Sequence, residues 1–458
     1  MIEEIQLLQR ERSRHIGAEG LEHRLYALSQ IKRLLTEHEE EWLAALKADL
    51  HKHPVEAYAS EISVLLNEIA HIEKMLPSWL KPLSKERLLL SGRDKVVTVR
   101  KPYGSVLIIA PWNYPLQLAL MPAIGALAGG NGVVLKPSES APATSRLLQQ
   151  LVPAYFPKKV FHVVTGDREV GEKLTSLQWD FIFFTGSPET GQKVYEDAAR
   201  HLTPVLLELG GKNPCIIDHS GISETAIKKI IWGKFLNAGQ SCIAPDTVYV
   251  PREQLEDVLE MMKEQIRTFY GENPQFSESY GRIIHREHYD KILTFMTDGR
   301  VYYGGDASAD DCYIGPTLLV DLISGSPICT EEIFGPLLPV IPYDSVDDVI
   351  KTLQALPAPL CTYIFSKSQE TQSKIADEVQ SGAVSINEVM LHAVNPFLAF
   401  GGAGKSGLGK YHGEASFEAF TQPRPVYSKQ TPFLLSKQFP PYSKATLLAL
   451  RRLRRKIF

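Results

Sequence analysis

Apolar and charged positions alternate with helical spacing over residues 21–50. Leucine and isoleucine recur there every three or four positions, together with Trp42, which predicts one or two amphipathic helices. Over residues 93–110 the pattern changes to β-branched alternation, then a turn at 102–104, then a continuous apolar run. We expect an exposed strand or hairpin arm in the first part of this segment and a buried strand in the second.

Short apolar runs then recur along the chain, each separated from the next by a stretch long enough for a helix. They are Gly132–Leu135, Val160–Val164, Phe181–Thr185 and Val205–Leu209. Strands that alternate with helices predict βαβ units and a parallel sheet covered on both faces. Such a sheet binds ligands at the carboxyl ends of its strands, so the polar residues at those ends are the candidates for function.

A second series of elements follows a break at residues 210–214, and we place a domain boundary near residue 209. The predicted elements are a strand at 216–217, a helix over about 222–237, a strand at 247–250 and later strands near 337–341, 362–365 and 383–386. They predict a second α/β layer. The glycine-rich stretch 400–409 is typical of an irregular loop.

Composition excludes several classes of protein. A chain of 458 residues with 44% hydrophobic and 22% charged residues is long enough for several domains and is not disordered. Its 49 basic and 53 acidic residues give a net charge of −4, which argues against nucleic-acid binding. Five cysteines, odd in number and without metal-ligand spacing, argue against disulfides and against a metal site, and they favour a reducing cytoplasm.

Two segments bear on membranes. Residues 102–135 carry no charge, but prolines at 111, 115 and 122 interrupt them, and the chain opens without a secretory signal. From Ser428 onward no acidic residue occurs, and 447–458 is a basic, leucine-rich candidate helix. This tail fits either peripheral contact with an anionic membrane or a terminus that packs on a partner.

Two polar groups at predicted strand ends suit a nucleotide. The strand at 181–185 runs into Gly186 and then Ser187, which is placed to cap a helix, and a helix N-terminus attracts phosphate. Only Gly191 accompanies Gly186, so this motif by itself indicates a capped helix at least as strongly. Lys136 and Glu139 follow another strand; they suit two ribose hydroxyls, or form a solvated surface pair.

Three further residues carry reactive or stabilising groups. Cys242 lies among small and turn-forming residues, which favours an accessible nucleophile over an inert buried thiol, although no histidine is near it in sequence. Glu208 ends an apolar strand, where burial raises a carboxyl pKa toward that of a general base; the alternative is a carboxylate held by the backbone of the glycine turn. Asn113, between two prolines, either holds an oxyanion or simply forms a turn.

Taken together, these pieces resemble the aldehyde dehydrogenase superfamily, and its class 3 or fatty aldehyde dehydrogenase branch in particular. The resemblance is carried in order by PWNYP (111–115), KPSE (136–139), FTGS (184–187), LELGGKNP (207–214), GQSCIAPD (239–246), EEIFGP (331–336) and FGGAGKSGLG (400–409). It therefore spans nearly the whole chain. It departs from the family pattern at Ala399 and Lys405, in the loop near the expected substrate entrance.

The resemblance implies a role for each matching residue. Cys242 would be the nucleophile, Glu208 the base, and Asn113 with the backbone N–H of Cys242 the oxyanion hole. The residues expected to bind the cofactor, NAD and in some members NADP, are Trp112, Lys136, Glu139, Gly186, Ser187, Gly191, Glu332 and Phe334.

The resemblance also implies a fold and a reaction. The fold is a Rossmann-type parallel-sheet cofactor domain (1–83 and 104–208), an α/β catalytic domain (209–395), a small β oligomerisation element (84–103 and 396–428) and the basic tail (429–458). The expected reaction is NAD(P)-dependent oxidation of aliphatic, medium- or long-chain, or aromatic aldehydes to acids by a cytoplasmic homodimer. A CoA-acylating enzyme and an inactive structural homologue remain the alternatives.

Overall fold

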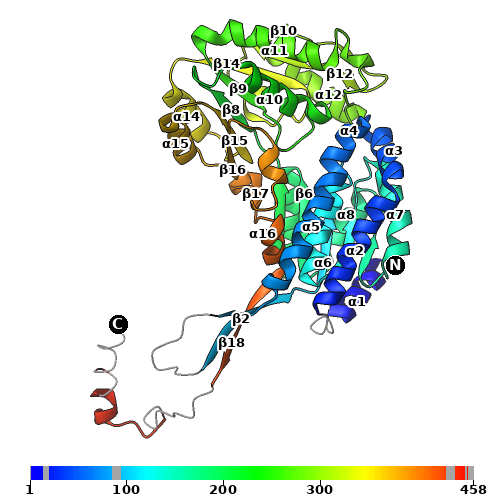
Figure 1. Cartoon of the computed structure of the whole chain (residues 1–458), viewed down its shortest axis with the longest axis vertical. Helices are drawn as coiled ribbons and strands as arrows, with labels where there is room; N and C mark the ends of the chain where they lie inside the picture. The colour runs from blue at the N-terminus through cyan, green and yellow to red at the C-terminus, as the bar shows by residue number, and fades with distance from the viewer. Residues whose placement is uncertain (1, 14–19, 85–93, 430–438, 449–450, 452–458) are drawn as a thin grey trace.

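The computed structural model describes residues 2–13, 20–84, 94–429, 439–448 and 451. They form two α/β lobes, each built on a sheet, and a narrow β arm that projects away from the first lobe (Figure 1). The N-terminus lies in the first lobe, and the last described residues lie beyond the arm. Residues 444–448 of the basic tail are helical, whereas 452–458, the most basic part of the predicted tail helix, lie outside the described residues.

The first lobe contains a six-stranded sheet of order β17-β7-β6-β3-β4-β5. Its strands are β3 (Ser105–Ile109), β4 (Gly132–Lys136), β5 (Phe161–Val163), β6 (Phe181–Gly186), β7 (Val205–Leu209) and β17 (Gly407–Leu408). The first five of these are parallel, as the alternation of strands and helices predicts. Strand β17 is antiparallel to β7, so the glycine-rich stretch is not wholly irregular as expected: two of its residues extend the sheet. A side chain at position 407 would lie 2.7 Å from the carbonyl oxygen of Leu207, which explains the glycine there.

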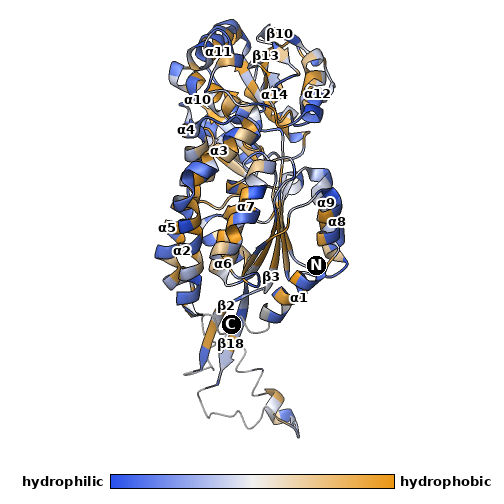
Figure 2. Ribbon diagram, turned by 90° about the vertical axis from the view of Figure 1, so that its right-hand side faces the viewer, coloured by the Kyte–Doolittle hydropathy of each residue, from blue (hydrophilic) through white to orange (hydrophobic). Residues whose placement is uncertain are grey.

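Helices cover both faces of this sheet (Figure 2). They are α1 (Ile2–Ser13), α2 (Leu21–Glu37), α3 (Glu39–Leu50), α4 (Pro54–Ala57), the π-helix η2 (Tyr58–Ile62), α5 (Ser63–Trp79), α6 (Gln117–Gly129), α7 (Pro142–Tyr155), α8 (Arg168–Thr175) and α9 (Pro188–Ala199). Helices α1, α8 and α9 pack on one face and α6 and α7 on the other, with α2 and α5 outside α6. Every residue of α6 from 118 to 129 is buried, which accounts for the charge-free stretch in the sequence.

The second lobe contains a seven-stranded sheet of order β10-β13-β14-β9-β8-β15-β16, parallel except for β10. Its strands are β8 (Pro214–Ile217), β9 (Thr247–Pro251), β10 (Arg300–Tyr303), β13 (Thr317–Val320), β14 (Leu337–Tyr343), β15 (Cys361–Phe365) and β16 (Ala383–Ile386). This is the predicted second α/β layer.

The helices of the second lobe also lie on two sides of their sheet. They are α10 (Glu224–Phe235), α11 (Leu255–Tyr270), α12 (Arg286–Phe295), α13 (Pro327–Thr330), α14 (Val346–Gln354) and α15 (Gln369–Glu378). Short connecting elements are η4 (Leu236–Gly239), η5 (Arg252–Gln254), η6 (Pro274–Phe276), η7 (Met296–Asp298), η8 (Leu391–Val394), η9 (Gly404–Ser406) and the β11–β12 hairpin (Ala307–Ser308, Tyr313–Ile314). Apolar residues of α14 and α15 pack on one face of the sheet, and those of α10 and α11 belong to the main core.

The arm is a three-stranded antiparallel sheet of β1 (Leu83–Ser84), β2 (Lys95–Pro102) and β18 (Thr421–Ser428). Strands β2 and β18 pair along their full lengths, from Pro102 with Thr421 to Lys95 with Ser428. The arm that the β-branched pattern predicts is therefore present. Within 396–428 only β18 belongs to it, because β17 joins the first sheet and α16 (Gly413–Ala419) packs on α6. Among the described residues, no helix combines the length and the apolar character needed to cross a bilayer.

Candidate active site

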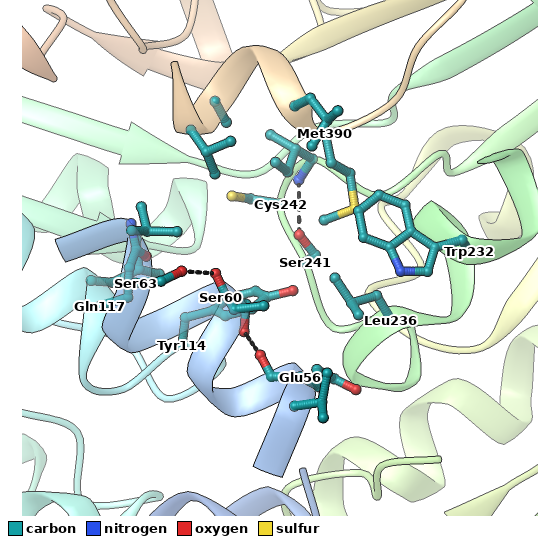
Figure 3. Close-up of a pocket in the computed structure, with 18 of the residues that line it drawn as sticks. Glu56, Ser60, Ser63, Tyr114, Gln117, Trp232, Leu236, Ser241, Cys242 and Met390 are labelled. Carbon is teal, nitrogen blue, oxygen red and sulfur yellow. Dashed lines mark hydrogen bonds between the residues drawn. The ribbon is translucent and has the colours of Figure 1, made fainter. Parts of the chain in front are cut away.

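Cys242 lies between the two lobes, in the loop that follows η4, and it is half-buried. Its thiol faces a cavity of about 580 Å³ that is lined by residues of both lobes (Figure 3). Cys215 and Cys361 are buried within strands of the second sheet, as their apolar neighbours in the sequence suggested. Cys242 is therefore placed to meet a small molecule that enters the cavity.

The backbone that leads to Cys242 is strained. Asn237, Ala238 and Gly239 have φ values of 52°, 51° and 76°, so three successive residues adopt the left-handed conformation, which costs energy for the two that carry a Cβ. Such strain persists only where surrounding contacts hold the chain in place, and it concentrates at functional sites.

Glu208 ends β7 and is buried, with 3% of its surface exposed. Neither carboxyl oxygen has a hydrogen-bond partner in the part of the chain that the structure describes, which argues against the alternative of a carboxylate held by the glycine turn. Burial raises its pKa well above the usual value, and Lys410 opposes that shift. Glu208 is thus a carboxyl group with free lone pairs and an affinity for protons that suits a base.

The Cys242 thiol is not pre-ionised in this site. Burial raises its pKa above the usual value, and the nearby carboxylates of Glu332 and Glu208 raise it further. The thiol is therefore protonated at neutral pH unless a base takes its proton or a positive charge binds beside it. Both carboxyl groups lie close enough to raise the pKa of this sulfur, so the fold brings residues 208, 242 and 332 near one another.

Asn113 is buried and lies against the Cys242 loop. Its side-chain nitrogen donates a hydrogen bond to the backbone oxygen of Gln240 at 3.1 Å. Because an amide nitrogen carries two N–H groups, this bond leaves one for a ligand. Asn113 is thus both a structural turn residue and a candidate oxyanion donor.

The carboxyl ends of β4 and β6 place the predicted nucleotide-binding residues along one edge of the first sheet. Lys136 is buried at the end of β4 and pairs with Glu139, whose side chain is 46% exposed. Ser187 caps α9 as predicted, because its hydroxyl accepts a hydrogen bond from the Thr190 N–H at 3.3 Å. Gly186 precedes this cap, and Gly191 packs against Leu209 in the first turn of the helix.

An aromatic group lies after β3, the strand between β4 and β6 in this sheet. The Phe334 ring contacts Trp112 with centroids 5.4 Å apart, and His288 contacts both rings. Phe334 has a φ of 50°, a strained conformation for a residue with a side chain. Beside it, burial raises the pKa of Glu332 to about 8, and one of its carboxyl oxygens has no partner among the described residues.

The residues along this sheet edge fit a dinucleotide. At the ends of β6 and β7, Thr185 and Glu208 are paired in register and carry buried oxygens that lack hydrogen-bond partners within the described ranges, as does Glu332 nearby. Buried polar atoms are nearly always satisfied, so such a group of unsatisfied atoms at a ligand-binding sheet edge indicates that a polar ligand completes it.

The sequence pattern of the aldehyde dehydrogenase family matches residues 10–426. The chain belongs to the aldehyde dehydrogenase family. The fold described above is the aldehyde dehydrogenase fold, and the protein is an enzyme that oxidises aldehydes to acids.

Relatives and solved structures agree with this assignment. This aldehyde dehydrogenase is 46% identical to 4,4'-diapolycopene-4,4'-dial dehydrogenase of Cytobacillus firmus over 443 residues, 96% of this chain and 97% of that protein. It is 38% identical to "Aldehyde dehydrogenase, dimeric NADP-preferring" of Canis lupus familiaris, over 88% and 89% of the two chains. The substrate-bound structure of Staphylococcus aureus AldH superposes with a TM-score of 0.96 at 36% identity and covers 99% of each chain.

The cavity of this aldehyde dehydrogenase has a polar wall that the sequence analysis did not identify. Glu56, Ser60 and Ser63 come from α4, η2 and α5, and they face Trp232, Leu236 and Met390 across the cavity (Figure 3). The spacing of Ser60, Ser63 and Asn67 places three polar residues on one face of a helix, and this spacing was the one sequence feature that could have pointed to a polar wall. The helical pattern gave no indication that this face lines a cavity shared by the two lobes rather than facing solvent.

Proposed function

We propose that Cys242 is the nucleophile of this aldehyde dehydrogenase, that Glu208 is its general base, and that its substrates are medium- or long-chain aliphatic or aromatic aldehydes. The observation that carries this proposal is the placement of the Cys242 thiol at a large, mainly apolar cavity and near Glu208, whose carboxyl oxygens have no hydrogen-bond partner among the described residues. A cavity of this composition favours aldehydes with extended apolar bodies.

The reaction begins with loss of the Cys242 proton to solvent, which the positive charge of a bound nicotinamide would favour. The thiolate attacks the aldehyde carbon, and the new oxyanion accepts hydrogen bonds from Asn113 and the backbone N–H of Cys242. Once hydride has left the tetrahedral carbon, Cys242 carries a thioester. Glu208 then takes a proton from water, which attacks the thioester and releases the acid.

The proposed cofactor is NAD(P)⁺, which when bound accepts the hydride. Lys136 and Glu139 would hold the adenosine ribose, Gly186, Ser187 and Gly191 the diphosphate, and Glu332 the nicotinamide ribose. Trp112 and Phe334 would flank the nicotinamide ring. The half-exposed carboxylate of Glu139 repels a 2'-phosphate, which favours NAD, although the canine relative is named as NADP-preferring.

A kinetic panel tests the reaction and the cofactor together. With aldehydes from short to long and each cofactor in turn, we expect one free acid per reduced cofactor, higher kcat/KM for long or aromatic aldehydes, and lower KM for NAD than for NADP. Glu139→Gln removes the repulsion, so it should narrow the difference between the two cofactors. With CoA added, an acyl-CoA product without free acid would instead establish the CoA-acylating alternative. A protein that is inert with every aldehyde and both cofactors, with and without CoA, would support the structural homologue.

We further propose that the enzyme is a homodimer formed through the arm. Strand β18 is the outer strand of the three-stranded arm sheet, and it carries the exposed side chains of Val426 and Tyr427. Over residues 421–426 the outer edge of β18 pairs with no other described strand, and an exposed strand edge is a template for pairing with a second chain.

The oligomeric state can be measured by sedimentation at micromolar concentration. The wild-type enzyme should sediment at twice the mass of the chain, and Val426→Glu should shift it toward the monomer because it places a charge on the proposed pairing strand. Phe276→Glu, at a residue 80% exposed on the second lobe, is the matched control and should leave the dimer intact. A monomeric wild-type enzyme would refute the dimer.

We also propose that the enzyme is cytoplasmic and that its basic tail contacts anionic membranes. Lys444 and Arg451 lie near Leu447 and Leu448, which are about half exposed, so basic and apolar groups occur together there. Vesicle co-sedimentation that persists after removal of 445–458 would refute this role.

A further inference from the structure

A buried ion pair lies directly behind the candidate oxyanion residue. Lys52 and Glu61 pair with each other, and both side chains are completely buried. Taking two charges out of water is expensive, and such a pair persists only where further hydrogen bonds satisfy the remaining donors and acceptors. The partners that satisfy this pair show what it holds in place.

The remaining bonds of Lys52 and Glu61 go to the turn that begins at Asn113. The Lys52 ammonium donates to the backbone oxygen of Asn113 at 3.0 Å and lies 3.9 Å over the Tyr114 ring. At the other end of the turn, Glu61 Oε2 accepts hydrogen bonds from the N–H groups of Leu116 at 2.9 Å and Gln117 at 3.1 Å.

Glu61 therefore caps α6 from a distant segment. Helix α6 begins after Leu116, which has no side chain able to satisfy the first N–H groups, so the Glu61 carboxylate takes that place. Glu61 itself belongs to the π-helix η2, a rare conformation that is frequent at functional sites. The two members of the pair thus fix the first and the last peptide groups of one short turn.

A second connection links this turn to the nucleophile. The Asn237 side chain donates to the same Asn113 oxygen at 2.7 Å and to the backbone oxygen of Gln240 at 3.2 Å. The Asn113 carbonyl thus accepts from both Lys52 and Asn237. With both acceptor sites used, the peptide plane of Asn113 has little freedom to rotate.

We infer that Lys52 and Glu61 are positioning residues that hold the Asn113 side-chain amide at the oxyanion site beside Cys242. They touch neither the cavity's substrate space nor the sulfur: they act through Asn113. This inference rests on the proposed oxyanion role of Asn113.

Lys52→Met removes the donor and keeps the length of the side chain. We expect kcat to fall about 10²-fold with KM unchanged, since small misplacements of a reacting or stabilising group have effects of this size. Arg252→Met, which breaks an exposed ion pair with Asp344, is the matched control and should leave kcat unchanged.

A double-mutant cycle separates positioning from general damage. In an Asn113→Ala background, Lys52→Met should slow the enzyme by less than about threefold, because the group that it positions is already gone. If Lys52→Met slows both backgrounds equally, the inference fails while the oxyanion role stands. If Asn113→Ala itself has the wild-type rate, the oxyanion role of Asn113 fails, and the inference fails with it.

A variant that lacks both charges tests whether unfolding, instead of misplacement of Asn113, explains the loss of activity. Lys52→Met with Glu61→Gln removes both charges of the pair and keeps a side-chain oxygen that can accept from the N–H groups of Leu116 and Gln117. This pair should melt cooperatively near the wild-type temperature and still have a kcat about 10²-fold low. A wild-type kcat in this folded variant would overturn the inference.

Discussion

Replacing Cys242 by serine should lower aldehyde oxidation at least about 10³-fold, a loss of about 4 kcal/mol of transition-state stabilisation. The hydroxyl is a far weaker nucleophile than the thiolate at any pH that the fold tolerates. Cofactor affinity should remain within about twofold of wild type, because Cys242 lines the substrate cavity and not the sheet edge. Stopped-flow absorbance of the reduced cofactor and a binding titration measure the two quantities.

Cys329→Ser is the matched control for this prediction. Cys329 is also half-buried in the second lobe, and its sulfur forms hydrogen bonds with Ser326 and with the backbone oxygen of Ile323, which a hydroxyl can replace. It should keep the wild-type rate. A Cys242→Ser enzyme with more than a tenth of wild-type activity would remove Cys242 from the mechanism.

Glu208→Gln should separate the two halves of the reaction. General-base catalysis contributes about 10² to 10⁴ in rate, so steady-state turnover should fall by that factor while the first turnover still releases reduced cofactor. The expected trace is a burst of one cofactor per site followed by a slow phase. Because neither carboxyl oxygen of Glu208 has a partner among the described residues, glutamine should not destabilise the fold.

The matched control is Glu68→Gln, another buried carboxyl whose pKa burial raises to about 7. Glu68 accepts a hydrogen bond from the Gly413 N–H at 2.7 Å and lies outside the cavity lining, so its replacement should leave the burst and the turnover unchanged. Unaltered turnover in Glu208→Gln would assign the base to another group.

The same two residues set the expected pH dependence. Glu208 accepts a proton only when ionised, and Cys242 attacks only as the thiolate; burial raises the pKa of both. The rate should therefore increase as pH rises through neutrality and beyond. In Glu208→Gln the rate of the slow phase, which is thioester hydrolysis, should increase less with pH than in the wild-type enzyme. The rate of the burst, which depends on ionisation of Cys242, should still increase with pH.

Much of the architecture was predictable because the strands of parallel sheets have a recognisable sequence pattern. Strands buried on both faces are continuous apolar runs, and β3, β4, β6 and β7 occur within a residue or two of their predicted bounds. Glu208 could be identified as a candidate base for a related reason: it lies at the end of a predicted strand, and local patterns mark strand ends well.

The parts that escaped prediction depend on contacts between distant segments. Lys52 and Glu61 resemble the ordinary charges of amphipathic helices, and nothing local distinguishes a buried pair from a solvated one. The raised pKa of Cys242 likewise comes from Glu208 and Glu332, which are near it only in the folded chain. Glycines 401–409 suggested a loop, because the role of Gly407 as a strand residue depends on its approach to β7.

Strand β17 has a consequence for how the enzyme is made. Residues 105–209 supply five strands of the first sheet, but the edge of β7 stays uncovered until Gly407 and Leu408 have left the ribosome. An uncovered strand edge is prone to mispairing during synthesis, and closure of so long a loop is slow. The first lobe therefore reaches its final form only after the second has been translated, so a chain that ends before residue 407 should expose this edge and aggregate.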